Sequence, residues 1–480
     1  MSDADAGPPA ASPPASADAA ASPPAAPAAG PPAAADPMEI LKSRSYLQLL
    51  VLAAVIGVPV SAVAYGFLAL VGHLQHWFYT SIPSSLGFHG TPVWWPFPLL
   101  LVAGILVSLS IRYLPGTSGH LPAEGLKTGG TPRPIDLIGV FLAALATLSL
   151  GAVLGPEAPL IAIGGGLGVL AVNLAARDAP PMAATVMAAA GSFAAISTLL
   201  GSPFVGAFLL MEAAGLGGPL LGLVLVPGLL AAGIGTLIFI GLDSLTGLGT
   251  FSLAIPGLPV FSHPTVAMFG WALAIGVVAA FVGTAIRLSG LALQAVVDKK
   301  RLVLTPAAGL VVAACAVIFF EITGKGSENV LFSGQNQLPG LVLQAGTWTV
   351  GALVVLIIAK SVAYAFSLSG FRGGPVFPSM FIGAALGEAA SHLPGMVLVP
   401  SVAMGIGALA TVMLKLPLTS TLLAVLLFAS DGLSVTPLVI VAVVVAYVLS
   451  ARLPQTPAEL KRGGTTGRAT GTPDPVAPAA

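Results

Sequence analysis

Residues 156–168 read PEAPLIAIGGGLG, and residues 375–387 repeat the pattern as PVFPSMFIGAALG. The two segments start 219 residues apart and share two prolines, an isoleucine, a leucine and two glycines at matching places. A second pair follows in the same order, because Gly191 stands twelve residues before Pro203 and Gly405 stands twelve residues before Pro417. The chain therefore contains an internal duplication, with halves of about 200 residues each.

The composition places both halves in a lipid bilayer. Of the 480 residues, 56% are hydrophobic and 8% are charged, which does not suit a protein with a water-exposed surface. Apolar stretches that can cross the hydrocarbon as helices of roughly 20 residues lie at 47–72, 95–111, 137–154, 219–241, 264–286, 304–320, 349–366 and 435–449. Other apolar segments are shorter and interrupted by glycine or proline. The sequence predicts an all-α polytopic membrane protein.

The duplication and the composition together predict four regions. Residues 38–242 form the first membrane repeat and residues 263–451 form the second. Residues 1–37 consist almost entirely of Ala, Pro, Ser, Gly and Asp, so we expect a disordered N-terminal tail. Residues 452–480 are again rich in Gly, Thr, Pro and Ala, and we expect a short disordered C-terminal tail.

The few basic residues predict the orientation in the cell membrane. Lys42 and Arg44 precede the first predicted helix, and Lys461 and Arg462 follow the last one. Short flanks rich in Lys and Arg stay on the cytoplasmic side, so we expect both termini to be cytoplasmic and the number of crossings to be even. The net charge is zero, which gives no argument for a nucleic-acid partner.

Repeated halves with short, broken apolar segments at matching places are typical of a transporter or channel whose binding site lies between the halves. Pro156 and Pro375 each predict the first residue of a helix that begins inside the membrane. A helix N-terminus offers free N–H groups and the positive end of a dipole, which bind an anion. Close packing of these helices is permitted by the GxxxG spacings Gly164 with Gly168 and Gly383 with Gly387.

Three short segments carry a family resemblance. Residues 155–159, GPEAP, match the motif Gly-Arg-Glu-Gly-Pro at Gly155, Glu157 and Pro159. The motif Ser-Gly-x-x-Gly-Gly-x-Phe-x-Pro is similar to the segment that contains Ser369, Gly370, Gly373, Gly374, Val376, Phe377 and Pro378. The motif Gly-Ser-Gly-Ile-Pro has a degraded counterpart in Ser118, Gly119, His120, Leu121 and Pro122. In this order, from about residue 45 to about residue 450, the chain resembles the CLC family of chloride channels and proton/chloride exchangers.

The resemblance implies two inverted repeats with tilted, broken intramembrane helices, and a homodimer in which each subunit has its own pore. It also implies that Glu157 is the gate, whose carboxylate occupies an anion position and swings away when it is protonated or displaced. The role makes physical sense, because a carboxylate at a helix N-terminus uses the same N–H groups that would bind chloride. The alternative is an ordinary helix-capping acid.

The anion ligands depart from the family pattern. Proline replaces the family's usual arginine at position 156 and stands at the corresponding position 375, and each proline removes a backbone donor. We expect the anion to be held mainly by the amides of Glu157, Ala158, Val376 and Phe377, unless a water or another amide substitutes.

Two further ligands of the family are displaced or missing. Alignment on Pro122 puts Gly119 at the place of the coordinating serine and leaves Ser118 one residue early, so either the hydroxyl is lost or the loop shifts. Both residues remain candidate anion ligands. The coordinating tyrosine has no match around residues 455–458, and Tyr447 is expected to be an interfacial or packing residue.

Proton coupling is the third departure. The family's exchangers carry an inner glutamate, the second of two acids, and here Glu212 matches the first acid while Ala213 occupies the second place. Carboxylate relays carry protons through membranes, so we expect a channel or a weakly coupled transporter. A relay through Glu212 and a proton/chloride antiporter remain alternatives. Arg372 and Lys415 are interpreted as attracting anions, whereas Lys360 is interpreted as snorkelling to the interface.

Two other classes of function fit less well. An inverted-repeat transporter of another solute would typically turn carbonyl groups or carboxylates toward its ion. An intramembrane enzyme would need a catalytic motif, and the sequence has neither HExxH nor GxSxG. We therefore expect no enzymatic activity, no metal site and no cofactor, and the expected partners are the bilayer and chloride or a similar anion.

Overall fold

The computed structural model describes residues 37–126, 131–175, 180–215, 219–247, 255, 257–261, 263–428 and 432–459. The predicted tails lie outside these residues except at their inner ends, where Pro37 begins the first helix and Arg452 ends the last. The described part is helical apart from connecting loops and one isolated β-bridge, between Gly155 and Gly374. The all-α prediction is confirmed.

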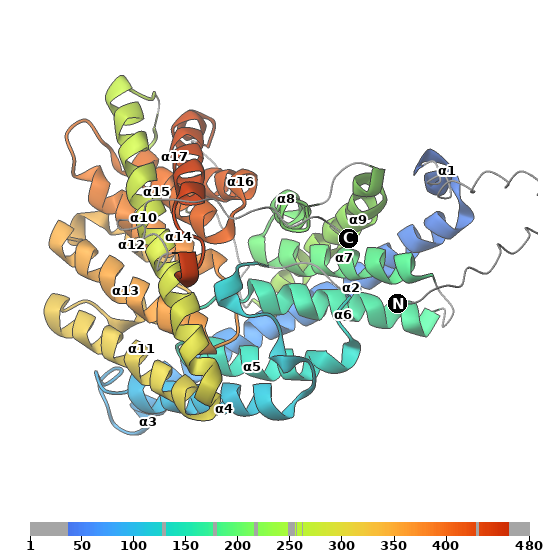
Figure 1. Ribbon diagram of the computed structural model, residues 1–480, viewed down its shortest axis with the longest axis horizontal. Coiled ribbons are helices and arrows are strands. Elements are labelled where there is room, and N and C mark those ends of the chain that lie inside the picture. Colours follow the sequence, from blue (N-terminus) through green and yellow to red (C-terminus); the bar gives the residue numbers. More distant parts are fainter. Residues whose placement is uncertain are drawn as a thin grey trace, which may run out of the picture.

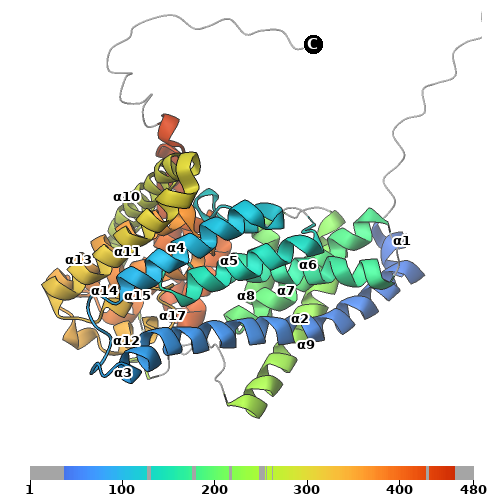
Figure 2. The same ribbon diagram turned by 90° about the horizontal axis from the view of Figure 1, so that it is seen from below.

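The helices of the first half are α1 (Pro37–Lys42), α2 (Arg44–His76), α3 (Ile82–Ser85), α4 (Pro96–Tyr113), α5 (Leu137–Ser149), α6 (Glu157–Ala175), α7 (Pro181–Leu200), α8 (Pro203–Ala213) and α9 (Pro219–Thr246). Those of the second half are α10 (Val266–Val297), α11 (Arg301–Thr323), α12 (Leu338–Leu343), α13 (Val350–Gly370), α14 (Val376–Ser391), α15 (Leu398–Leu414), α16 (Pro417–Leu427) and α17 (Gly432–Arg452). The blue-to-green half and the yellow-to-red half lie side by side (Figures 1 and 2).

The packing of the helices repeats the duplication seen in the sequence. Helix α6 packs on α7 as α14 packs on α15, and α2 packs on α9 as α10 packs on α17. Between the halves, α4 contacts α11 and α8 contacts α16, which are the corresponding members of the two repeats (Figure 1). Contacts between corresponding helices are what a pseudo-two-fold axis produces. The molecule thus has the architecture of two related repeats.

Eight helical segments of the described chain are long and apolar enough to cross a membrane, and shorter apolar helices such as α8, α14 and α16 accompany them. One predicted span is wrong in its extent. The apolar stretch 137–154 does not continue as a helix, because α5 ends at Ser149 and Gly151 follows with a φ of 109°. Residues 150–156 form a buried loop instead, and that loop brings the chain to the start of α6.

The glycine spacings allow the helix backbones to approach closely, as predicted. A Cβ added at Gly164 of α6 would collide with the carbonyl oxygen of Gly191 in α7. The second half repeats this contact, since a Cβ at Gly383 of α14 would collide with the carbonyl oxygen of Gly405 in α15. Small residues at such crossings are a common way to pack helices in lipid, where no hydrophobic effect drives association.

The crossing of α14 and α15 can be tested with a single methyl group. We expect Gly383→Ala to lower the melting temperature of the purified protein, because overpacking costs about 1–3 kcal/mol. The matched control is Gly270→Ala in α10, where an added Cβ meets nothing within 4 Å. That variant should melt at or slightly above the parent temperature, because alanine favours helix more than glycine. Equal melting temperatures for the two variants would contradict the crossing.

Candidate anion site

The two halves meet at a bridge between equivalent residues of the duplication. The N–H of Gly155 donates to the carbonyl oxygen of Gly374 at 2.8 Å, and the N–H of Gly374 donates back to Gly155 at 2.6 Å. Helices α6 and α14 begin two residues after these glycines, so their N-termini lie together. Each helix starts one residue later than expected, because Pro156 precedes α6 and Pro375 is the N-cap of α14.

Hydroxyl groups from the opposite half fix the two loops that cross at the bridge. Ser367 of α13 accepts a hydrogen bond from the N–H of Val153 at 3.0 Å. Thr147 of α5 accepts one from the N–H of Arg372 at 3.2 Å. Each hydroxyl donates in turn to a carbonyl oxygen one turn earlier in its own helix. The buried N–H groups of Val153 and Arg372 are thereby satisfied without water.

Glu157 lies at the centre of this arrangement. Its side chain is fully buried, and its Oε1 accepts a hydrogen bond from the N–H of Phe377, in the first turn of α14, at 2.9 Å. Within the described chain its Oε2 has no partner. A Cβ at Gly155 or Gly374 would collide with the carboxylate, so both glycines form its cradle. A carboxylate of one half therefore occupies the helix N-terminus of the other half, where an anion would bind.

Two cavities adjoin the N-terminus of α6. The first, called the amide cavity, is lined by Leu154 and Pro156 together with Gln75, Ser333, Gln335, Asn336 and Gln337. The second, called the serine cavity, is lined by Ala158 and Pro159 together with Ser118, Gly119, His120, Arg372 and Gly373. Pro156 and Ala158 flank Glu157 in the chain and face different cavities. The two chain neighbours of Glu157 thus line different cavities, while Glu157 itself is buried.

The structure keeps a hydroxyl at the serine cavity. Ser118 is 1% exposed, and its Oγ has no partner among the described residues. The backbone is irregular here, since Thr117, Ser118 and Gly119 have φ values of 51°, 58° and 95°. Residues other than glycine rarely adopt positive φ, and such residues cluster at functional sites. Both Ser118 and Gly119 line the cavity, and their role as anion ligands stays a prediction.

Glu212 is a structural link between the halves. Its carboxylate accepts hydrogen bonds from the N–H of Leu418 at 3.0 Å, from the N–H of Thr419 at 2.8 Å and from the Thr419 hydroxyl at 2.7 Å. These groups lie in the first turn of α16, so Glu212 caps that helix across the contact of α8 with α16. Ala213, the next residue, ends α8.

Two residues of α13 were missed or misinterpreted from the sequence. Lys360 does not snorkel to the interface, because it is fully buried and its Nζ donates to the carbonyl oxygens of residues 329–332 at 2.9–3.3 Å. These carbonyls belong to the loop that leads into the amide cavity. Tyr364, one turn later, is also buried and donates to the carbonyl oxygen of Pro375 at 3.0 Å. The sequence signal that could have revealed this pair is a Lys and a Tyr four residues apart in an otherwise apolar helix.

The other predicted residues lie at the periphery. Lys415 is exposed at the end of α15, so it does not contribute to either cavity. Tyr447 is 39% exposed on α17, as expected for an interfacial or packing residue. Arg372, in contrast, is buried in the wall of the serine cavity.

The capping role of Glu212 predicts an effect on stability. Glu212→Ala should lower the melting temperature, because loss of a helix cap costs about 1–2 kcal/mol, and Glu212→Gln should lower it less, because an amide oxygen still accepts a hydrogen bond. Glu321→Ala, which removes an exposed acid at the end of α11, is the control. An unchanged melting temperature for Glu212→Ala combined with a loss of transport would instead indicate a functional acid.

Comparison with known proteins agrees with this geometry. The family model described as voltage gated chloride channel matches residues 103–451. The "Putative ion-transport protein YfeO" of Salmonella paratyphi A is 30% identical over 356 residues, which cover 72% of this chain and 81% of that protein. The protein of the same name from Escherichia coli O17:K52:H18 is 28% identical over 358 residues, or 72% of this chain and 79% of that protein.

Solved structures share the fold. The structure of a slow cyanobacterial Cl⁻/H⁺ antiporter is similar with a TM-score of 0.67 and 19% identity, covering 88% of this chain and 99% of that chain. A CLC-type fluoride/proton antiporter gives a TM-score of 0.63 and 20% identity, with 85% and 96% covered. With the match of the family model, these likenesses confirm the inverted-repeat fold and the resemblance seen in the motifs. The chain therefore belongs to the voltage-gated chloride channel (CLC) family, and it is a multi-pass membrane protein of a family that transports anions.

Proposed function

We propose that the protein passes chloride or a similar small inorganic anion across the membrane through a pathway that Glu157 gates. The observation that carries the proposal is the position of the Glu157 carboxylate. It is buried and accepts a hydrogen bond from the N–H of Phe377 at 2.9 Å, and the residues on either side of Glu157 in the chain line two different cavities. The amides of Glu157, Ala158, Val376 and Phe377, with Ser118 and Gly119, are the proposed anion ligands.

The gate works by competition for one site. A charged carboxylate and a chloride ion both need the N–H groups at the start of α14, so only one of them can occupy that place. Protonation removes the charge of Glu157 and with it the attraction to the helix N-terminus. The carboxyl group then leaves the site, and an anion from either cavity replaces it.

We propose that passage is channel-like or only weakly coupled to protons. The place of a second acid after Glu212 is taken by Ala213, and the carboxylate of Glu212 is engaged by α16. A proton/anion antiporter is the second candidate, because two of the similar solved structures are described as antiporters. A transporter of another solute is a more remote candidate, since it does not account for a carboxylate on a helix N-terminus.

The proposed assembly is a homodimer in the cell membrane with one pathway per subunit and both termini cytoplasmic. It follows the family resemblance and the Lys and Arg residues that flank the first and last helices. Residues 38–242 and 263–451 are the two proposed repeats of each subunit.

The gate predicts a defined pH dependence. Chloride efflux from liposomes that contain the parent protein should rise on acidification, by at most about tenfold per pH unit for one titrating group. Glu157→Gln mimics the protonated acid and Glu157→Ala removes the blocking group, so both variants should conduct with little dependence on pH. Glu321→Gln, at an exposed acid, should keep the parent profile. If both Glu157 variants fold and also keep that profile, Glu157 is a structural cap.

The missing relay predicts the absence of proton counter-transport. In liposomes with a chloride gradient and a pH-sensitive dye, chloride should move without driving protons uphill. Uphill proton movement would assign the antiporter function instead. Flux of sodium or of an amino acid in place of chloride would refute an anion pathway altogether.

A further inference from the structure

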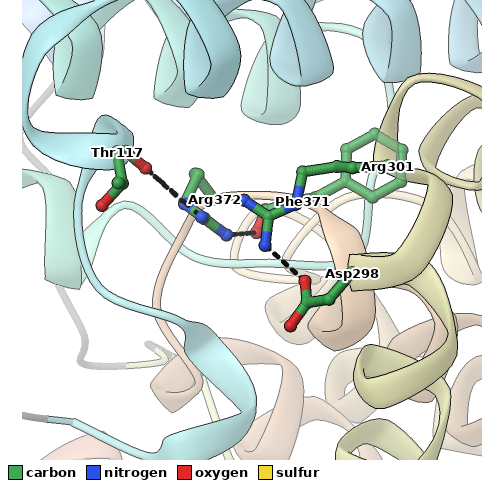
Figure 3. Close-up of polar contacts among 5 residues, drawn as sticks. All are labelled: Thr117, Asp298, Arg301, Phe371 and Arg372. Carbon is green, nitrogen blue, oxygen red and sulfur yellow. Dashed lines mark hydrogen bonds and ion pairs between the residues drawn. The ribbon is translucent and has the colours of Figure 1, made fainter.

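Arg372 has a buried guanidinium that the fold leaves incompletely bonded. The residue lies in the loop between α13 and α14 and is 3% exposed. Its Nε and one terminal nitrogen donate to the carbonyl oxygen of Thr117, and the other terminal nitrogen donates to that of Phe371, all at 3.3 Å (Figure 3). These distances exceed the usual 2.7–3.2 Å for N–H···O bonds. A guanidinium has five N–H groups, so each terminal nitrogen keeps one that has no acceptor among the described residues.

No carboxylate forms an ion pair with this cation within the part of the chain that the structure describes. Asp298 and Glu124 attract Arg372 from a longer distance, and Asp298 is bonded to Arg301 (Figure 3). A buried charge without a paired counter-charge is costly in a protein interior and rare in a membrane. The expected partner is therefore an anion that does not belong to the chain.

The duplication shows that the backbone does not need an arginine here. The equivalent position of the first half is Val153, which is also buried and whose N–H is also bonded to a hydroxyl of the other half. The two positions therefore share their burial and their backbone hydrogen bond but not their side chain. Only the second half carries a charged side chain at this position, and that side chain lines the serine cavity.

The surroundings of Arg372 favour a small anion. Among the residues that the structure describes, the wall of the serine cavity contains no Asp or Glu, and the Oγ of Ser118 in that wall has no partner. Ala158, in the first turn of α6, contributes the positive end of that helix. The guanidinium supplies both a charge and free N–H groups.

We propose that Arg372 is a ligand of the transported anion in the serine cavity. The anion pairs with the guanidinium and with the hydroxyl of Ser118 while the carboxylate of Glu157 still occupies the start of α14. A bound anion thus waits directly beside the gate and replaces the carboxylate when the gate is protonated. The inference rests on the proposed function and names the side chain that holds its substrate.

The inference can be tested by measuring the affinity of the full-length protein for chloride in detergent, by titration calorimetry. Arg372→Met should weaken chloride affinity by about tenfold or more, because it removes charge-assisted hydrogen bonds. Arg372→Lys should lose less, since it keeps the charge without the planar donors. The matched control is Arg301→Met, at a neighbouring arginine that is bonded to Asp298 and does not line the cavity, and it should stay within about twofold of the parent.

The outcomes separate the inference from the proposed function. If the parent neither binds nor passes chloride, the proposed function fails and the inference fails with it. If the parent passes chloride and Arg372→Met binds chloride as tightly as the parent, the inference alone is overturned. If Arg372→Met does not fold, the inference is tested by locating bromide, by its anomalous diffraction, in crystals of the parent protein. An anomalous peak within about 3.5 Å of the guanidinium supports the inference, and bromide peaks found only elsewhere refute it.

Discussion

Two backbone hydrogen bonds between Gly155 and Gly374 hold the centre of the molecule, and the rest of the site depends on them. In a bilayer an unpaired N–H or carbonyl group costs several kcal/mol, so a chain can leave the helical conformation only where other groups replace the lost bonds. The bridge and the hydroxyls of Thr147 and Ser367 provide this replacement for both loops at once. Two helices can therefore begin side by side in the interior of the protein.

The positive ends of two helices meet at this centre, and the carboxylate of Glu157 balances their charge. The starts of α6 and α14 lie around one carboxylate, that of Glu157. Without an anion, this carboxylate partly compensates the positive ends of the helices. On the proposed mechanism, an anion competes with this carboxylate for the same N–H groups. The same electrostatic constraint thus explains why the acid is stable in a buried place and, on the proposed mechanism, why it leaves when an anion replaces it.

Much of the fold and the position of Glu157 at a helix start could be predicted from the sequence, because the duplication marks equivalent positions and Pro-Glu marks a helix start. Contacts across the halves could not be predicted. Glu212 caps a helix 206 residues away, and Ser118 reaches its cavity through a turn with positive φ that spacing does not reveal. Residues 150–154 were expected to be helical because an apolar run has the same composition in a buried loop as in a helix.

The two cavities beside Glu157 differ in fixed charge. Neutral amides such as Gln75 and Gln335 line one of them, whereas Arg372 lines the other. A fixed positive charge raises the local concentration of anions on its own side. On the proposed pathway an ion that enters by the arginine side therefore meets a lower barrier than one that enters by the amide side. Such a pathway behaves as a rectifier, and its current at equal and opposite voltages is unequal even though the two halves of the protein are built on one pattern.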